Sequence, residues 1–364
     1  MDNKDKNCKE MSSRERFTTV LEHKIPDRIP VFDFLFSKPL YNEILGMNIK
    51  KYNDLDYFLL ADALGLDATL LSTGMPEEYI LKTLSDDTFI DEWGTVYRIA
   101  ENTWPSSTPF DHIINNKEDL KNLKIPDGSE EKRYFEAIKA IEKNNNKLAS
   151  IAIITGPFTM VMMIIGLSKM SKYIYDEPEF INDLLKITAN YCLQLIEGFN
   201  KIGVDAILVA DDLGFSGGTL FNPEWYRKNL FPYFRELVKE IKKKDMYPIL
   251  HSDGDIRLII QDIIDIGFVG LNPIEKKSNM DLKEIRERFG NKLTLSGNVD
   301  SSKTLVYGNK EEIIRETLNC MKGGGKEGAY VLSSDHSFRQ EIPNKNIFTM
   351  IETCKKYGKY PLNF

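Results

Sequence analysis

The chain has 364 residues, of which 42% are hydrophobic and 28% are charged, so it can bury a sizeable core and disorder is not expected. Lys and Arg number 48 and Asp and Glu number 55, which gives a formal charge of −7. This acidic balance argues against a nucleic-acid-binding protein and against docking on anionic membranes, because both depend on basic surfaces. The four cysteines form no CxxC pair, which excludes a disulfide framework and a thiolate-rich metal site.

No apolar run approaches the roughly 18 residues that a membrane-spanning helix needs. The N-terminal residues are charged and contain no apolar segment typical of a signal peptide. We therefore expect a cytoplasmic protein with reduced cysteines.

Eight short, mostly apolar segments recur along the chain, as is typical of strands buried on both faces of a parallel sheet. Eight β/α units favour a (β/α)8 TIM barrel within the α/β class over an open doubly wound sheet, and no GxGxxG motif follows the first strand. We expect one barrel domain over residues 1–364, with an N-terminal helical extension at about 1–25. The expected strands are residues 28–33, 66–72, 150–155, 204–210, 247–251, 268–272, 292–296 and 329–333.

Helical patterns separate the later strands. One begins with Asn222 as the N-cap and Pro223 at the first helical position. The insertion after the second strand, at about residues 73–148, is expected to form an antiparallel hairpin over one mouth of the barrel. The expected helices are residues 179–199, 222–244, 255–266, 281–289, 310–322 and 344–357.

Polar, carboxylate or imidazole side chains follow nearly every expected strand. The active site of a (β/α)8 barrel lies at the carboxyl ends of its strands, so these groups are expected to share one mouth. The alternative is that the strands simply end in polar turn residues. The candidates are Asp33, Ser72, Thr155, Asp211, Asp212, His251, Asp253, Asn272, Asn298, Asp335 and His336.

His251 and Asp253 are two residues apart, so on an extended segment their side chains point the same way. His336 follows the eighth strand and can converge with them across the mouth. Two imidazoles and a carboxylate suit Zn²⁺ or another divalent ion with an open position for a substrate atom. The alternatives are two ordinary hydrogen-bonded histidines, and a turn at residues 253–254 followed by a helix cap at Asp255.

Asp211 and Asp212 follow a buried apolar run. Adjacent carboxylates repel each other, so they can raise the pKa of one for acid chemistry or hold a cation together. An Asx turn is the alternative. Methionines 160, 162, 163 and 170 suit either a plain core or an apolar ligand pocket.

Several of these segments form a joint pattern from about residue 12 to the end. It comprises Asp-Arg-Ile-Pro-Val at 27–31, Thr-Gly-Pro-Phe-Thr at 155–159, Asp-Asp-Leu-Gly at 211–214, Asn-Pro-Glu-Trp-Tyr at 222–226, His-Ser-Asp-Gly at 251–254, Gly-Asn-Val-Asp at 297–300 and Ser-Asp-His at 334–336. The pattern resembles the uroporphyrinogen decarboxylase superfamily, which includes the cobalamin-dependent methyltransferases, and this resemblance also implies a (β/α)8 barrel.

The chain departs from the family pattern at two places. Residues 32–37 are Phe-Asp-Phe-Leu-Phe-Ser, where porphyrinogen decarboxylases carry arginines that grip substrate carboxylates. His251-Ser-Asp253 stands where the thiol methyltransferases have His-x-Cys, and His336 stands at their later Cys. A site without thiolates favours an oxygen-containing substrate over a thiol.

The resemblance thus implies a cobamide-dependent methyltransferase of anaerobic metabolism that moves a methyl group from a small O- or N-methyl substrate to a corrinoid protein. The corrinoid would belong to that partner, and His251, Asp253 and His336 would hold Zn²⁺ or polarise the leaving oxygen. Asp211 or Asp212 would orient the substrate or supply a proton. No nucleic-acid or membrane partner is expected, and an oligomer is open. The expected substrate contacts are Asp33, Phe158, Tyr226, Asn272 and Asn298.

Two alternatives remain open at this point. One is a decarboxylase of the same type that acts on another substrate, which arginines lining the mouth would favour. The other is a non-catalytic corrinoid or tetrapyrrole binder, whose aspartates and histidines would not converge.

Overall fold

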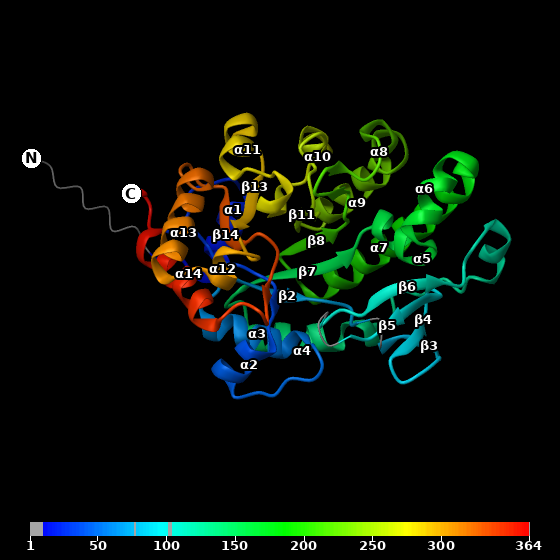
Figure 1. Ribbon diagram of the computed structural model, residues 1–364, viewed down its shortest axis with the longest axis horizontal. Coiled ribbons are helices and arrows are strands. Elements are labelled where there is room, and N and C mark those ends of the chain that lie inside the picture. Colours follow the sequence, from blue (N-terminus) through cyan, green and yellow to red (C-terminus); the bar gives the residue numbers. More distant parts are fainter. Residues whose placement is uncertain (1–9, 76–77, 101–103, 364) are drawn as a thin grey trace, which may run out of the picture.

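The computed structural model describes residues 10–75, 78–100 and 104–363. Seven parallel strands form one strongly curled sheet in the order β14-β13-β12-β11-β8-β7-β2, with helices around its outside (Figure 1). All seven overlap segments that the sequence predicts as strands. They are β2 (Ala68–Leu71), β7 (Ala149–Thr155), β8 (Ala206–Ala210), β11 (Tyr247–His251), β12 (Gly270–Ile274), β13 (Thr294–Val299) and β14 (Tyr330–Ser334).

The prediction of a first strand at residues 28–33 is wrong in detail. Val31 forms a single parallel bridge with Leu332 of β14, and the Asp67 backbone N–H donates to the Val31 carbonyl at 2.8 Å. The segment therefore lies between the two edge strands of the sheet without being a regular strand. Pro30 has no N–H to give to a ladder, and the Val31 N–H donates to the Asp67 carboxylate instead of a strand carbonyl. Regular pairing begins only at β1 (Leu35–Phe36), which runs parallel to β15 (Phe338–Arg339).

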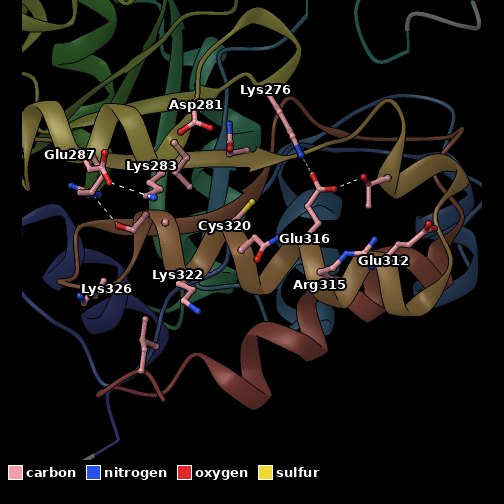
Figure 2. Close-up of a pocket in the computed structure, with 18 of the residues that line it drawn as sticks. Lys276, Asp281, Lys283, Glu287, Glu312, Arg315, Glu316, Cys320, Lys322 and Lys326 are labelled. Atoms are coloured by element: carbon pink, nitrogen blue, oxygen red, sulfur yellow. Dashed lines mark hydrogen bonds and ion pairs between the residues drawn. The ribbon is translucent and has the colours of Figure 1, made fainter. Parts of the chain in front are cut away.

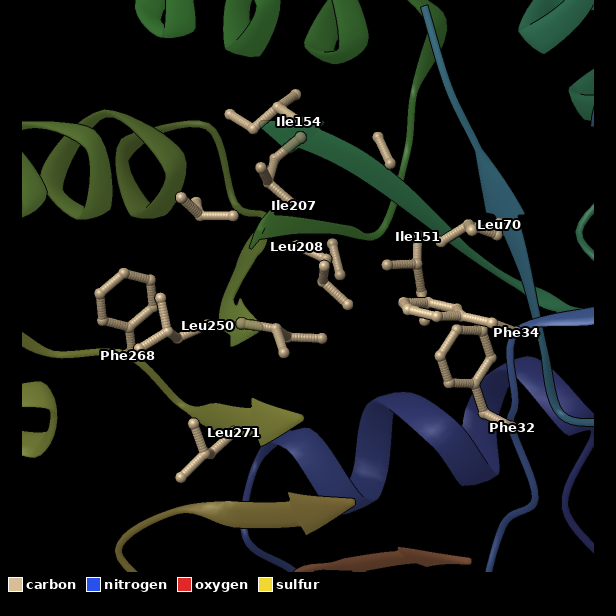
Figure 3. Packing of buried hydrophobic residues seen from close by; sticks show 14 of the residues in the cluster. Phe32, Phe34, Leu70, Ile151, Ile154, Ile207, Leu208, Leu250, Phe268 and Leu271 are labelled. Carbon is tan, nitrogen blue, oxygen red and sulfur yellow. The ribbon is translucent and has the colours of Figure 1, made fainter. Parts of the chain in front are cut away.

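The interior of the curled sheet is packed with apolar side chains (Figure 3). Ile151, Leu208 and Ile249, from three neighbouring strands, line this interior and are almost completely buried. At the amino ends of the strands, Phe17 and Leu21 of α1 (Ser13–Leu21) close this interior, and the Thr294 hydroxyl donates to a carbonyl of α1 at 2.6 Å. The expected N-terminal helix is thus present, and it closes the end opposite to the strand carboxyl ends.

Two expected helices differ from the prediction. The helix expected at residues 222–244 is broken at Leu230 into α8 and α9, because Pro232 cannot donate the N–H that would continue α8. The Asn222 cap is confirmed, since its side chain accepts from the Glu224 N–H. The helix expected from residue 255 begins only at Ile260. The other expected helices are found with small changes at their ends.

The helices that follow α1 are α2 (Lys38–Leu45), α3 (Asp54–Leu64), α4 (Phe135–Asn144), α5 (Pro157–Ile165), α6 (Leu167–Asp176), α7 (Pro178–Ile202), α8 (Pro223–Asn229), α9 (Phe231–Lys243), α10 (Ile260–Ile266), α11 (Leu282–Phe289), α12 (Thr304–Tyr307), α13 (Lys310–Gly324) and α14 (Asn344–Tyr357), with short 3-10 turns η3 (Lys117–Asn122), η4 (Glu131–Tyr134) and η5 (Lys276–Ser278).

The insertion after β2 holds a four-stranded antiparallel sheet in the order β3-β4-β5-β6, rather than one hairpin. This sheet lies beside α5 (Figure 1), where the Thr95 hydroxyl donates to the Met163 carbonyl at 2.9 Å. A second short hairpin, β9 (Gly214–Phe215) and β10 (Gly218–Thr219), follows β8. None of the helices in the described ranges is long and apolar enough to cross a membrane. The strands of the insertion are β3 (Ile80–Thr83), β4 (Thr88–Asp91), β5 (Thr95–Arg98) and β6 (Thr108–His112).

Candidate functional site

A cluster of one imidazole and two carboxylates lies at the carboxyl ends of β8 and β11. His251 is the last residue of β11, Asp253 follows two residues later, and Asp212 follows β8, the neighbouring strand. The His251 Nε2 atom lies 4.0 Å from the Asp212 Oδ1 atom and 3.9 Å from the Asp253 Oδ1 atom. One ligand atom from each of the three residues lies within 4.8 Å of the others. The prediction that polar groups converge at this edge is therefore met for these three residues.

Asn272 sets the orientation of the His251 ring. The His251 Nδ1 atom lies 2.8 Å from the Asn272 Oδ1 atom, while the Asn272 amide nitrogen donates to the Ser296 hydroxyl at 3.2 Å. An amide oxygen only accepts hydrogen bonds, so Nδ1 carries the proton and Nε2 faces the carboxylates with a free lone pair. That tautomer is the one a metal-binding histidine needs. The Phe34 ring, 5.4 Å away between centroids, packs against the same imidazole.

The loop at Asp253 is held by backbone contacts that require a glycine next to it. The Asp253 N–H donates to Asp212 Oδ1 at 3.0 Å, and the Gly254 N–H donates to Glu275 Oε2 at 2.9 Å. Gly254 has φ of 86°, and a Cβ atom there would lie 2.3 Å from the backbone of Gly214. A side chain at position 254 would therefore displace Asp253 from the cluster.

The Asp253 carboxyl is the least satisfied group of the site. Its Oδ1 atom is buried and has no hydrogen-bond partner among the described residues. Burial raises the pKa of Asp253 above its usual value, although the neighbouring His251 and His336 act in the opposite direction. A buried oxygen without a partner is costly unless a ligand completes its contacts.

His336 stands on the other side of Asp253. Its Nε2 atom lies 3.5 Å from the Asp253 Oδ2 atom, and its Nδ1 atom is 2.7 Å from the Ser337 hydroxyl. Burial lowers the pKa of His336. The metal set expected from sequence was His251, Asp253 and His336, whereas the donor set within 4.8 Å has Asp212 in the place of His336. Asp212 follows β8, the direct neighbour of β11, whereas His336 follows β14 and approaches the set from the side of the Asp253 Oδ2 atom.

These donors fit a divalent ion of the zinc type. Two carboxylates and one neutral imidazole are common Zn²⁺ ligands, and three protein ligands leave a fourth position for a substrate oxygen. The unsatisfied Asp253 Oδ1 atom points to the same conclusion, because ion binding would give it a partner. Without thiolates the set suits oxygen-containing ligands.

Asp211 has a different environment from Asp212. Its buried carboxylate accepts hydrogen bonds from the backbone N–H groups of Phe158 and Thr159, at the start of α5. Burial raises the pKa of Asp211 to about 7 against the effect of these N–H groups. Asp211 therefore caps α5, and only its neighbour Asp212 reaches the cluster.

Phe158 and Tyr226, two expected substrate contacts, have no exposed surface. Their rings meet at 5.5 Å in an aromatic cluster with Phe221 and Trp225, and the Tyr226 hydroxyl donates to the Leu213 carbonyl at 2.9 Å. Because both rings are enclosed, they support the loop after β8.

Asn298 and Asp33 also serve as supports. The Asn298 amide nitrogen donates to the carbonyls of Ile274 and Met280, which fixes the loop after β12. Asp33 is 1% exposed and accepts from the Ser334 N–H at 2.6 Å and the Ser334 hydroxyl at 3.0 Å. It thus ties the first segment to the end of β14.

The stability of the protein is expected to fall as pH rises because of Asp33. Burial raises the pKa of Asp33 to about 8, whereas an aspartate in an unfolded chain titrates near 3.9. Between these values the folded chain holds a proton that the unfolded chain has lost, so the free energy of unfolding decreases with rising pH. Asp33→Asn cannot lose this proton, and urea unfolding at pH 5 and pH 8 should show a smaller decrease for the variant. Asp245→Asn, which removes an exposed carboxylate, is the control and should keep the wild-type decrease. An equal decrease in Asp33→Asn would contradict this assignment.

A cavity of about 300 Å³ lies between the insertion sheet and the carboxyl ends of β2 and β7. Thr155, at the end of β7, lines it and pairs with Ala210, which in turn pairs with His251, so the cavity is one strand from Asp212 and two strands from His251. Only the methionine pattern pointed to this cavity before the fold was known. Of the four methionines named above, Met160 and Met163 line the cavity, and Met170 is fully buried core. The aromatic lining residues are Phe36, Tyr52, Tyr79, Trp93, Tyr97 and Tyr191.

A second, more open hollow lies in the outer helical layer, between α11 and α13 (Figure 2). Its rim carries charges of both signs, and the Lys276 ammonium pairs with Glu316 at 2.9 Å. None of its lining residues belongs to the cluster at the strand ends. The aromatic cavity is not lined by residues of the cluster either, but it opens at the same carboxyl edge of the sheet, where Thr155 lines it.

The curled parallel sheet, with its donors at the carboxyl ends of the strands, defines an enzyme of the α/β-barrel type. The sequence profile described as "Uroporphyrinogen decarboxylase (URO-D)" matches residues 90–357. This chain belongs to the uroporphyrinogen decarboxylase family.

Among curated relatives, a uroporphyrinogen decarboxylase of Chlorobaculum parvum is 26% identical over 314 residues, which is 81% of each chain. A uroporphyrinogen decarboxylase of Actinobacillus pleuropneumoniae is 25% identical over 69% of this chain and 71% of the relative. Among solved structures, a methyltransferase from Methanosarcina mazei has a TM-score of 0.74 at 20% identity, over 96% of this chain and 99% of the other. A B12-independent methionine synthase from Shewanella has a TM-score of 0.52 at 11% identity, over 90% and 96%. These two structures show the likeness of the fold.

Proposed function

We propose that this protein is a methyltransferase that moves a methyl group from a small O- or N-methyl substrate to a corrinoid protein. The observation that carries the proposal is the cluster of Asp212, His251 and Asp253 with its unsatisfied oxygen, at the same edge of the sheet as an aromatic cavity. The similar fold of a Methanosarcina methyltransferase supports the same choice.

Different residues of the site would orient the imidazole, bind the metal ion and hold a proton. Asn272 holds the His251 ring so that Nε2 faces the opening, and the two carboxylates supply oxygen ligands on either side. A divalent ion bound there would act as a Lewis acid on the leaving oxygen or nitrogen, and a corrinoid on the partner protein would supply the methyl acceptor. The leaving atom departs with the electron pair of its bond to the methyl carbon and then needs a proton. His336, at 3.5 Å from Asp253, is placed to hold that proton.

A decarboxylase acting on another substrate is the second candidate, because the curated relatives carry that name and the buried Nε atom of Arg339, three residues beyond His336, has no hydrogen-bond partner among the described residues. Against it, the arginine lining the cavity, Arg133, is already bound by Glu92 through two contacts of 2.7 and 2.6 Å. The first segment also carries Phe34 and Phe36 where the decarboxylases carry arginines. A non-catalytic binder is disfavoured because Asp212, His251 and Asp253 converge.

The test is methyl transfer to a reduced corrinoid protein, followed by the absorbance change of the corrinoid on methylation. Methoxylated and N-methylated compounds are offered as donors to the full chain after loading with Zn²⁺. We expect methylation with the wild-type protein and a loss of about 100-fold or more with Asp253→Asn, since a ligand and its charge are removed. Asp255→Asn, which changes a carboxylate of the same loop that pairs with Arg257, is the matched control. Carbon dioxide release without methyl transfer would establish the decarboxylase instead.

A further inference from the structure

Arg339 carries a charge that the described part of the chain does not neutralise. It is the second residue of β15, three residues beyond His336, and its Nε atom is buried without a hydrogen-bond partner. No carboxylate of the described residues pairs with it, whereas Arg133 and Arg16 are held by acidic partners. A buried guanidinium nitrogen without a partner is unfavourable, so an external acceptor would stabilise it.

The pairing of β1 with β15 places this side chain toward the cavity. Arg339 lies opposite Phe36 in a parallel pair, and Leu35 lies opposite Phe338. Paired residues on neighbouring strands project to the same face of a sheet, while successive residues project to opposite faces. Leu35 and Phe338 are fully buried on one face, and Phe36 lines the cavity on the other. The Arg339 side chain therefore projects to the same face as Phe36, beside the residues that line the cavity.

Arg339 is also linked to the cluster along the chain. It lies three residues beyond His336, whose Nε2 atom is 3.5 Å from the Asp253 carboxylate. On the other side, the Phe36 ring stacks on Phe34 at 5.5 Å between centroids, and Phe34 packs on His251. A molecule held at Arg339 would thus reach both the aromatic cavity and the imidazoles.

The cavity itself offers an apolar environment. Its walls are aromatic rings and methionines, and the one cation that lines it, Arg133, is neutralised by Glu92. Such a cavity suits a planar or otherwise apolar body of limited size. A guanidinium with free N–H groups suits a carboxylate, which it can bind through two parallel hydrogen bonds.

We propose that the substrate is a carboxylate with an apolar, ring-sized body, and that Arg339 binds its carboxylate while the aromatic cavity holds the body. That this carboxylate also carries the methyl group to be transferred rests on the proposed function. The specificity then comes from two separate features: a charge at β15 and an apolar wall built by the insertion sheet.

Benzoate and benzamide are the probes, because they share a ring and differ in charge. Isothermal titration on the full-length protein should show benzoate binding about ten- to a hundredfold more tightly than benzamide, as for a hydrogen bond to a charged group. Arg339→Gln should remove this preference and leave benzamide unchanged, and Arg339→Lys should retain part of it. Arg315→Gln, an exposed arginine of α13, is the matched charge control and should bind both probes like the wild type. Circular dichroism establishes that the variants fold.

The outcomes separate this inference from the proposed function. Equal benzoate binding by wild type and Arg339→Gln would overturn the role of Arg339, even if methyl transfer proceeds. If Arg339→Gln keeps the benzoate preference but binds the corrinoid protein more weakly, the inference is also overturned, because Arg339 would then contact the partner protein and not the substrate. Loss of the benzoate preference in Arg339→Gln supports it, whether or not methyl transfer is later found. An absence of methyl transfer with all donors would count only against the proposed function.

Discussion

Replacing His251 by alanine is expected to weaken Zn²⁺ binding by at least about 100-fold, because loss of a ligand should cost no less than loss of an outer-shell partner. His251 supplies the nitrogen of the cluster, and the remaining Asp212 and Asp253 would repel each other without it. Isothermal titration of metal-stripped protein with Zn²⁺ measures the effect directly. The same variant should lose methyl transfer to the same extent.

Two further variants test whether the weaker Zn²⁺ binding of His251→Ala comes from loss of a ligand at this cluster. Asn272→Ala leaves all three ligands but frees the His251 ring, and should weaken Zn²⁺ binding by about 10- to 100-fold. His23→Gln changes a histidine whose Nε2 atom contacts the Val269 carbonyl at the amino end of the sheet, so its Zn²⁺ affinity should equal that of the wild type. If His251→Ala binds Zn²⁺ as tightly as the His23 variant, the cluster is not a metal site.

Replacing Asp67 by alanine is expected to lower the free energy of unfolding by about 3–5 kcal/mol, as for removal of one partner from a buried ion pair. Asp67 is fully buried and binds Arg16 at 2.7 Å, Arg28 at 2.9 Å and the Val31 N–H at 2.8 Å. Arg16 is itself 3% exposed and would be left with Asp27 alone as its acidic partner. The first segment would also lose its attachment to β2.

Urea unfolding at neutral pH measures this loss. Glu136→Ala is the control, because Glu136 pairs with Lys139 on the exposed face of α4 at 2.6 Å and such pairs contribute about 0–1 kcal/mol. A similar small loss in both variants would show that the buried network does not hold the first segment in place. The network explains the Asp27-Arg28 positions of the family pattern as structural residues.

The regular elements of this fold could be predicted from local pattern. The strand at residues 247–251 and the helix at 344–357 match the structure at both ends, because each has a clear apolar pattern and a clear boundary. The first segment could not be predicted, because its hydrogen bonds go to Asp67 and Leu332, which are distant in the chain. The insertion was predicted as one hairpin, whereas it forms four strands. The strands are short, and the outer two, β3 and β6, are largely exposed, so their apolar pattern is weak.

Residue pattern alone predicts that polar groups follow the strands, and hence that His251, Asp253 and Asp212 share one edge of the sheet. Which of the two adjacent aspartates reaches the cluster depends on how the folded chain packs. Asp211 turns inward to cap α5, and Asp212 turns outward, because α5 begins beside the end of β8. The position of Arg339 was also decided there, through its pairing with Phe36 some 300 residues earlier in the chain. Local residue pattern determines where strands end, whereas the direction of each side chain at those ends depends on partners that only the folded chain brings together.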